Sequence, residues 1–279
     1  MDVKKPTILS LSIQAVRRLF ADEAIPLAGN IAFRTLFSIF PFLIFLTALA
    51  GFFGNEALAE KVVTFLLSVA PEQLVRPLAG EITSILTVPR TGLLSIAALL
   101  TIWSATGGID SVRVALNRAY DLKETRNTFW LYGQSILFVI GSAAGLLAFA
   151  LLIVFAPLFF AFMDRYAPGF HQNLTMLNDL RYPIAVALLT GGLQLCHRVL
   201  PAKKLGALEI LPGVLLTVFV WIGLSAAFSI YLVNFNSFAS TYASLSGLFA
   251  AMFFLYLAAV VLILGGEVNR ALRLRKQSE

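Results

Sequence analysis

The sequence predicts an all-α, polytopic membrane protein with six transmembrane helices. Hydrophobic residues make up 59% of its 279 residues, and charged residues only 13%, whereas a soluble domain carries about a quarter charged residues. Six long apolar segments follow one another, and a spanning helix needs about 20 such residues. The positive charge of the connecting loops alternates along the chain. These three observations fix the class before any motif is considered.

The six spans are expected at residues 31–53, 92–109, 131–163, 183–200, 210–233 and 243–266. The second is the weakest of them. The third is longer than one perpendicular span requires, and we expect Pro157 to end or bend it.

The Lys and Arg residues predict the orientation. Fifteen of the 21 lie in the N-terminal arm, in the loops after the second and fourth segments and in the tail, and five lie in the other loops. Cytoplasmic loops carry such an excess, so both termini are expected in the cytoplasm. This orientation requires an even number of spans. The net charge of +6 is therefore attributed to topology, and no nucleic-acid partner is expected.

Two regions outside the spans show amphipathic periodicity. Residues 8–20 place Leu9, Ile13, Val16 and Phe20 on one side, which predicts a helix lying on the membrane surface. The outer loop 54–91 has apolar residues at three- and four-residue steps, which predicts two amphipathic helices that lie on the outer leaflet or cap the bundle. The predicted division is a cytoplasmic arm (1–30), a transmembrane domain (31–267) and a basic tail (268–279).

The first span contains the most conspicuous candidate residues. An ionised side chain such as Arg34 costs at least ~2.5 kcal/mol at the bilayer centre, so Arg34 either snorkels to the headgroups or meets an anionic substrate or an acid at a gate. Ser38 extends this polar side toward Pro41. Pro41 should open the backbone ladder, as in the broken helices of transporters, although a kink used only for packing is the alternative.

Charged and polar residues also gather at the predicted cytoplasmic ends of the second and sixth spans. They are Asp110, Asn117, Arg118, Glu267 and Asn269. With Arg34 they form either a charged vestibule, in which Glu267 or Asp110 pairs with Arg34, or an ordinary solvated rim.

Three further patterns are weaker. Tyr242 and Ser244 belong to an uncharged polar stretch that lines a pathway or forms an ordinary outer loop. A Gly-x-x-x-Gly motif in the third span permits a homo-oligomer contact. Isoleucine and proline at 39–41 recur at 210–212, and the glycine pair 107–108 recurs at 265–266; this echo indicates a parallel repeat of two hairpins or chance similarity.

Several chemistries lack a sequence signal. No phosphate-binding glycine loop, paired metal-binding acids or Ser/His/Asp arrangement is visible. The single cysteine, Cys196, excludes an intramolecular disulfide. We therefore expect no cofactor, no metal and no enzymatic activity.

Three motifs resemble the YihY/virulence factor BrkB family. The first lies in residues 28–54, around Phe37-Ser38-Ile39-Phe40-Pro41. The second is Trp103-Ser104-Ala105 followed by Ala115-Leu116-Asn117-Arg118-Ala119-Tyr120, and the third is Tyr242-Ala243-Ser244-Leu245 leading to Leu264-Gly265-Gly266-Glu267-Val268-Asn269. The resemblance implies a bacterial inner-membrane protein of six spans. Members of that family were once labelled ribonuclease BN, and serum resistance, lipid A precursor export and solute transport have been suggested for different members. No catalytic residues follow from it; Ser38, Pro41, Asn117, Glu267 and Asn269 inherit importance only.

The sequence thus favours a transporter or lipid translocator, with membrane lipids, a polar solute or a lipid headgroup as its partner. A non-transporting envelope scaffold is the second hypothesis, and the outer amphipathic helices would be its contact surface. A ribonuclease is the remote third.

Overall fold

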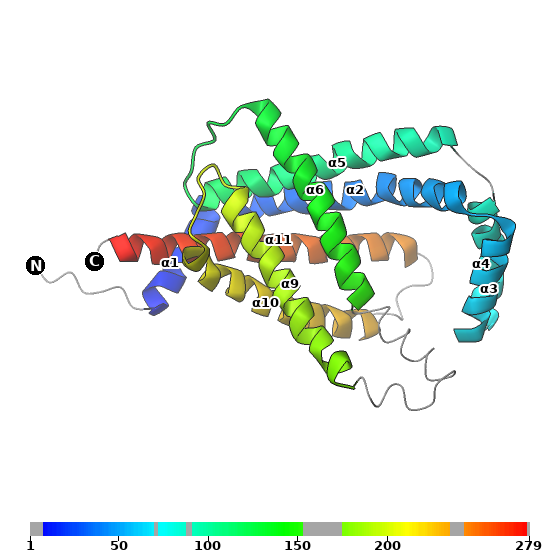
Figure 1. Cartoon of the computed structure of the whole chain (residues 1–279). Coiled ribbons are helices and arrows are strands. Elements are labelled where there is room, and N and C mark those ends of the chain that lie inside the picture. Colours follow the sequence, from blue (N-terminus) through cyan, green and yellow to red (C-terminus); the bar gives the residue numbers. More distant parts are fainter. Residues whose placement is uncertain (1–7, 70–71, 88–90, 153–174, 235–242, 278–279) are drawn as a thin grey trace, which may run out of the picture. The chain divides into compact units, whose positions relative to one another are not determined.

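The computed structural model describes residues 8–69, 72–87, 91–152, 175–234 and 243–277, and every regular element among them is a helix (Figure 1). This confirms the all-α class. The helices are α1 (Ile8–Ala21), α2 (Ala24–Phe53), α3 (Glu56–Val69), α4 (Glu72–Thr87), α5 (Thr91–Ala119), α6 (Thr128–Ala150), α9 (Thr175–Val199), α10 (Ala207–Asn234) and α11 (Ala243–Gln277).

Five of these helices, α2, α5, α6, α10 and α11, are long and apolar enough to cross a membrane. The chain is therefore a polytopic membrane protein, as the sequence predicts. The predicted fourth span lies in α9, which is 25 residues long but does not reach the same apolar character. The reason is composition, because Asp179, Arg181, Gln194, His197 and Arg198 interrupt its apolar sequence.

Helix bounds extend beyond the predicted spans in α2, α5 and α11, and α5 continues to Ala119, beyond the predicted 109. Helix α2 begins at Ala24, ahead of the predicted 31. Helix α11 continues to Gln277, so Glu267, Asn269 and Arg270 stand on an unbroken helix and not in a loop. The two helices predicted in the outer loop are confirmed as α3 and α4, which pack on each other. The predicted N-terminal helix is α1.

The chain divides into two compact units. Unit 1 comprises Met1–Phe33 and Ile109–Glu279, and unit 2 comprises Arg34–Gly108. The division falls within α2 and within α5, so each of these helices contributes to both units. Each unit is described by itself below.

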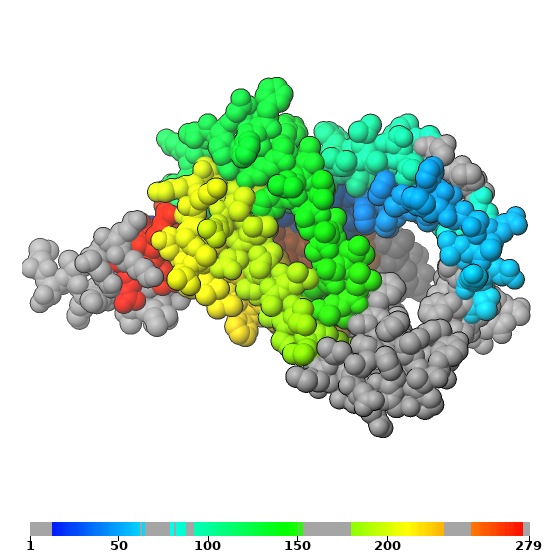
Figure 2. Space-filling view, in the orientation of Figure 1, coloured from blue at the N-terminus to red at the C-terminus, as the bar shows by residue number. Residues whose placement is uncertain are grey.

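Helix α11 is the packing centre of unit 1. Helices α10 and α1 pack on it, α9 packs on α10, and α6 packs on α9. A cluster of buried apolar side chains joins the end of α5 to α9, α10 and α11, and includes Leu116, Leu193, Ile210, Val214 and Leu262. Figure 2 shows α6 (green) and α9 (yellow-green) side by side on one face of this unit.

The closest helix approach in unit 1 depends on two glycines. A Cβ on Gly213 would collide with the carbonyl oxygen of Gly265, and a Cβ on Gly265 would collide with Thr217 Oγ1 and the carbonyl of Gly213. Small residues at such a crossing let two backbones meet within a membrane. The glycine pair at 265–266 therefore serves packing and does not end the helix.

Unit 2 has few buried side chains. Its portion of α2 exposes a run of large apolar residues, among them Phe37, Phe40, Leu43 and Ile44, and its portion of α5 exposes Leu99 and Trp103. Apolar surface of this extent on candidate spans is the surface that lipid covers.

Candidate functional site

A chain of buried hydrogen bonds links four elements of unit 1. His197 on α9 accepts a bond at Nδ1 from Tyr120 OH, 2.7 Å away. Asn269 Nδ2 on α11 donates to the same phenol oxygen at 3.0 Å. Asn269 Oδ1 accepts from the backbone N–H of Gly213 on α10 at 2.7 Å. Tyr120, His197 and Asn269 are each at most 2% exposed.

The hydrogen-bond roles in this chain determine the state of His197. Tyr120 accepts from Asn269, so its own proton is free to go to His197 Nδ1. Burial raises the pKa of Tyr120 far above its ordinary value, which keeps the phenol protonated as this role requires. His197 is then a neutral imidazole with its proton on Nε2, and this buried atom has no partner within the described part of the chain.

The Asn269 bond falls where α10 is weakened. Pro212 has no N–H, so the carbonyl of Leu208 lacks its usual donor four residues on. Gly213 follows directly, and its N–H meets Asn269 and not only its own helix. Thr217 Oγ1 donates to the carbonyl of Gly213 at 2.9 Å. Side chains of Asn269 and Thr217 thus bond both backbone groups of Gly213, the residue directly after Pro212.

Glu267 lies two residues before Asn269 on α11 and is fully buried. Neither of its carboxyl oxygens has a hydrogen-bond partner among the described residues. The charged groups that act on it are Asp22, Arg270 and Arg18, and the Asp22 carboxyl approaches it without reaching hydrogen-bond geometry. A buried carboxyl without a partner is costly to a fold and marks a functional position in membrane proteins.

Several ion pairs lie near Glu267 and Asn269, at the ends of α1 and α5. Arg270 binds Asp22 at 3.3 Å and Asp121 at 2.7 Å. Arg118 binds Glu23 at 3.2 Å, and both of these side chains are more than half exposed. Glu23 and Asp121 both have left-handed backbones, with φ of 56° and 55°, at the ends of α1 and α5. In this position each acid ends its helix and faces an arginine.

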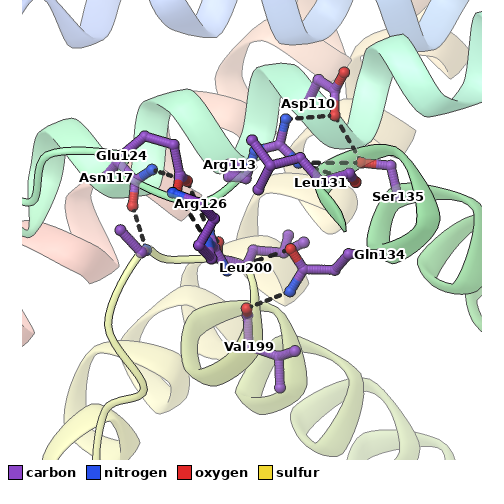
Figure 3. Close-up of polar contacts among 11 residues, drawn as sticks. Asp110, Arg113, Asn117, Glu124, Arg126, Leu131, Gln134, Ser135, Val199 and Leu200 are labelled. Carbon is purple, nitrogen blue, oxygen red and sulfur yellow. Dashed lines mark hydrogen bonds and ion pairs between the residues drawn. The ribbon is translucent and has the colours of Figure 1, made fainter. Parts of the chain in front are cut away.

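A second polar network joins the two loops at this end (Figure 3). Arg126 Nη2 donates to Glu124 at 2.7 Å and to the carbonyl of Leu200 at 2.7 Å. Asn117 Nδ2 donates to Glu124 at 3.1 Å, and Asn117 Oδ1 accepts from the N–H of Ala202 at 2.7 Å. Hydrogen bonds and the charge of Arg126 lower the pKa of Glu124 to about 2. The loop after α5 and the loop after α9 are therefore tied together.

The same figure shows how α5 binds α6. Arg113 pairs with Asp110 at 2.8 Å, and Arg113 Nη1 donates to the carbonyl of Leu131 at 3.3 Å. Ser135 Oγ donates to Asp110 at 2.6 Å (Figure 3). Asp110 thus has its partners within unit 1.

The predicted site residues fall into three groups. Asp110, Asn117, Arg118, Glu267 and Asn269 all belong to unit 1. All of them except Glu267 lie in the networks above. Arg34, Ser38 and Pro41 belong to unit 2, where Arg34 Nη1 donates to the carbonyl of Gly107 at 3.4 Å and Ser38 bonds its own helix at Thr35. The predicted pairing of Arg34 with Glu267 or Asp110 stays a prediction. Tyr242 and the side chain of Ser244 lie outside the described residues.

The sequence did not single out Tyr120 or His197 as site residues. Tyr120 lies within a family motif, and His197 is a polar residue in an apolar segment, which was a usable signal. Their meeting depends on a contact between residues 77 positions apart, which no local pattern reveals. The Gly141 and Gly145 pair of α6 has nothing within 4 Å of the added Cβ positions, so a homo-oligomer contact there also stays a prediction.

Comparison with known proteins identifies the family of this chain. A family model described as virulence factor BrkB matches residues 15–279. The chain belongs to the BrkB family. This confirms the resemblance carried by the three sequence motifs.

Relatives of this BrkB-family chain include the ribonuclease-like protein YfkH of Bacillus subtilis, 28% identical over 250 residues and covered to 90% in both chains. UPF0761 membrane proteins of Xanthomonas oryzae and Xanthomonas campestris are 25% identical over 260 residues. The match covers 90% of this chain but 58% of theirs, so the chain spans a little over half the length of those relatives. No solved structure matches.

Proposed function

We propose that this BrkB-family chain is a transporter or lipid translocator of the bacterial inner membrane. The observation that supports this most is Glu267, a fully buried carboxyl without a hydrogen-bond partner among the described residues, on a candidate span. Asn269, two residues on, bonds α10 where Pro212 opens the backbone ladder. Ionisable groups and broken helices together at one depth are typical of substrate and coupling-ion sites.

The proposed topology has six spans with both termini in the cytoplasm. In addition to the five candidate spans, α9 crosses the membrane as the fourth span in chain order. Helix α9 packs on α10 and α6, and its least apolar end carries His197, which is buried within unit 1. A polar residue that faces the bundle interior is tolerated in a span. Reporter fusions at the two termini test the count. Cytoplasmic reporters at both ends support six spans, whereas opposite sides would leave α9 out of the membrane.

Lipid translocation in proteoliposomes tests the function. Purified chain is reconstituted with a fluorescent phospholipid, and the fraction accessible to an impermeant quencher is recorded. We expect protein-dependent flipping that is lost in Glu267→Gln and in Arg34→Ala. Glu60→Gln, the same chemical change on the exposed face of α3, is the matched control and should retain flipping. All three variants must first show the size-exclusion profile of the wild type.

Negative outcomes separate the alternatives. Absence of flipping in well-folded protein directs the assay to soluble solutes such as osmolytes. Flipping that persists in Glu267→Gln and Arg34→Ala rejects the proposed path. Absence of any flux, together with a stoichiometric envelope partner that is lost on altering the exposed faces of α3 and α4, favours the scaffold.

We also propose that the chain is not a nuclease, although its relative YfkH bears a ribonuclease-like name. The described cytoplasmic loops are short, and their acids Glu124 and Asp121 are held by Arg126 and Arg270. RNA cleavage by highly purified chain that disappears in Glu124→Gln or Asp121→Asn would overturn this.

A further inference from the structure

The two loops tied together in Figure 3 bring basic side chains from distant parts of the sequence to one end of unit 1. Arg126 binds the carbonyl of Leu200, and Asn117 binds the N–H of Ala202. The loop after α5 carries Lys123, and the end of α9 with its following loop carries Arg198, Lys203 and Lys204.

These four cations are exposed, and none of them forms an ion pair with another described residue. The acids that could neutralise them are already engaged, because Glu124 is bound by Arg126 and Asp110 by Arg113. The low pKa of Glu124, about 2, reflects that pairing. Asp121, in the loop after α5, is bound by Arg270, and Glu209 is a further acid, exposed in the first turn of α10. The surface is therefore positively charged.

Aromatic side chains lie at the same end, in the first turn of α6. Phe129 is 88% exposed and Trp130 is 67% exposed. Trp130 precedes Gln134 by four residues and so lies on the same side of α6. Gln134 donates to the carbonyl of Val199 at the end of α9 at 2.6 Å. Trp130 therefore lies one turn of α6 from this contact with the end of α9, the helix whose following loop carries Lys203 and Lys204.

The side of α6 next to this loop is apolar and open along the span. Leu137, seven residues after Trp130, is 69% exposed. Gly141, seven residues after Gln134, has nothing within 4 Å of an added Cβ. A basic rim above an aromatic turn and an open apolar stripe has the chemical order of a phospholipid, with its phosphate above its acyl chains.

We propose that this surface, formed by Lys123, Arg198, Lys203, Lys204, Phe129 and Trp130 and called the α6–α9 patch, binds an anionic phospholipid of the membrane leaflet. The lysines of the α9 loop bind the lipid phosphate, and Trp130 and Leu137 contact the glycerol and an acyl chain. A nucleic acid or a soluble phosphate would match the cations but would leave the apolar half uncovered. The inference is independent of the proposed function, since a lipid can bind here whether or not the chain moves one.

Native mass spectrometry of the purified full chain, titrated with phosphatidylglycerol or phosphatidylcholine, tests the patch. We expect one class of phosphatidylglycerol sites that weakens about fivefold for each lysine replaced in Lys203→Gln and Lys204→Gln, because a lysine near an anionic surface contributes about that factor. Lys61→Gln, an exposed lysine on α3 in unit 2, is the matched control and should bind normally. Phosphatidylcholine binding should not respond to any of these changes.

Quenching of tryptophan fluorescence by phosphatidylglycerol with brominated acyl chains supplies a second readout. The chain has three tryptophans, and Trp130→Leu should remove the part of the quenching that depends on phosphatidylglycerol. Unchanged phosphatidylglycerol affinity in the double lysine variant would overturn the proposal. So would full displacement of the lipid by inorganic phosphate or by a short RNA, since that would identify a site for soluble anions.

Discussion

Among the described residues, polar side chains of unit 1 form several bonds between helices, whereas in unit 2 the bond from Arg34 to the carbonyl of Gly107 joins α2 to α5 and the hydroxyls bond within their helices. In unit 1 polar side chains reach from one helix to another, as Asn269 does to Gly213 and Tyr120, and Trp221 does to the carbonyl of Ala258. In unit 2 the hydroxyls of Thr47, Thr83 and Thr101 bond the backbone of their own helices. Interhelical bonds fix a register between helices, whereas bonds within a helix leave its neighbours unspecified. Unit 1 is therefore the part whose packing is specified by polar contacts.

The two glycine pairs make the same contrast. Gly265 meets the backbone of Gly213, which directly follows Pro212. Gly107 meets the flexible end of Arg34, which lies well before Pro41. In a parallel repeat these glycines would face equivalent positions relative to the two prolines, and they do not. The sequence echo between the two hairpins is thus not matched by equivalent contacts.

The largest expected difference in the free energy of unfolding is between alanine substitutions at Gly265 and at Gly107. Gly265→Ala should lower the free energy of unfolding by roughly 3 kcal/mol, because the new methyl meets backbone atoms that cannot move aside. Gly107→Ala should change it by less than about 1 kcal/mol, because the guanidinium of Arg34 can shift and alanine favours a helix. Thermal unfolding followed by reaction of a fluorogenic thiol reagent with Cys196, the single cysteine, together with aggregation measurements, gives both values. Equal losses would remove the contrast between the units.

Removal of a polar side chain should show the next largest difference. Asn269→Leu leaves Gly213 N–H and Tyr120 OH without their partner in a buried site, which should cost about 2–4 kcal/mol. Thr101→Val removes a bond within one helix and should cost less than about 0.5 kcal/mol. A double-mutant cycle of Asn269→Leu with Tyr120→Phe should reveal a coupling above about 0.5 kcal/mol. Additive effects would mean that the two side chains do not act together.

Two ion-paired arginines of unit 1 should contribute differently to stability, because one is more buried than the other. Arg270→Gln breaks contacts to Asp22 and Asp121 from a side chain that is 14% exposed, and should cost about 1–2 kcal/mol. Arg118→Gln breaks the exposed pair with Glu23, and such pairs contribute at most about 1 kcal/mol. The same unfolding assay at low and high salt distinguishes them. A larger loss for Arg118→Gln would contradict the order.

The smallest expected effect is a pH dependence of the loop network. The pKa of Glu124 is lowered from 4.5 to about 2, so its stabilising contribution is fully present above pH 4.5 and disappears as the pH falls toward 2. The stability difference between wild type and Glu124→Gln should shrink over this window. Hydrogen exchange of residues 117–127 at pH 7 and at pH 3.5 measures it. A difference that is constant with pH would exclude a role for the Glu124 charge.

Much of this architecture followed from composition and periodicity. Five of the predicted spans coincide with helices that can cross a membrane, and the outer loop contains the two expected helices. The predicted sixth span ended at 266, where the apolar run stops before Glu267, whereas α11 continues through this polar stretch to Gln277. Helix α9 was assigned from its apolar half, and its polar residues keep it below the character of the other five.

The candidate site could be predicted only in part. Glu267, Asn269 and Asn117 were singled out by their charge or polarity at span ends. Tyr120 and Gly213, the partners of Asn269, were not singled out, since a phenol after a helix and a glycine after a proline give no local signal of a partner. The sequence identified the groups that need partners, while the partners depend on how α5, α10 and α11 meet in space.

The packing of α1 against α11 has a consequence for synthesis of the chain. Ala15 and Leu19 of α1 are buried in unit 1, yet α11, the helix that α1 packs on, begins only at Ala243 and is made much later. At about 5–20 residues per second, α1 leaves the ribosome roughly 10 to 50 seconds before its partner exists. During that interval its apolar side must rest on the membrane or on a chaperone. Helix α11 therefore completes the docking of α1, and a nascent chain stalled before Ala243 would keep α1 undocked.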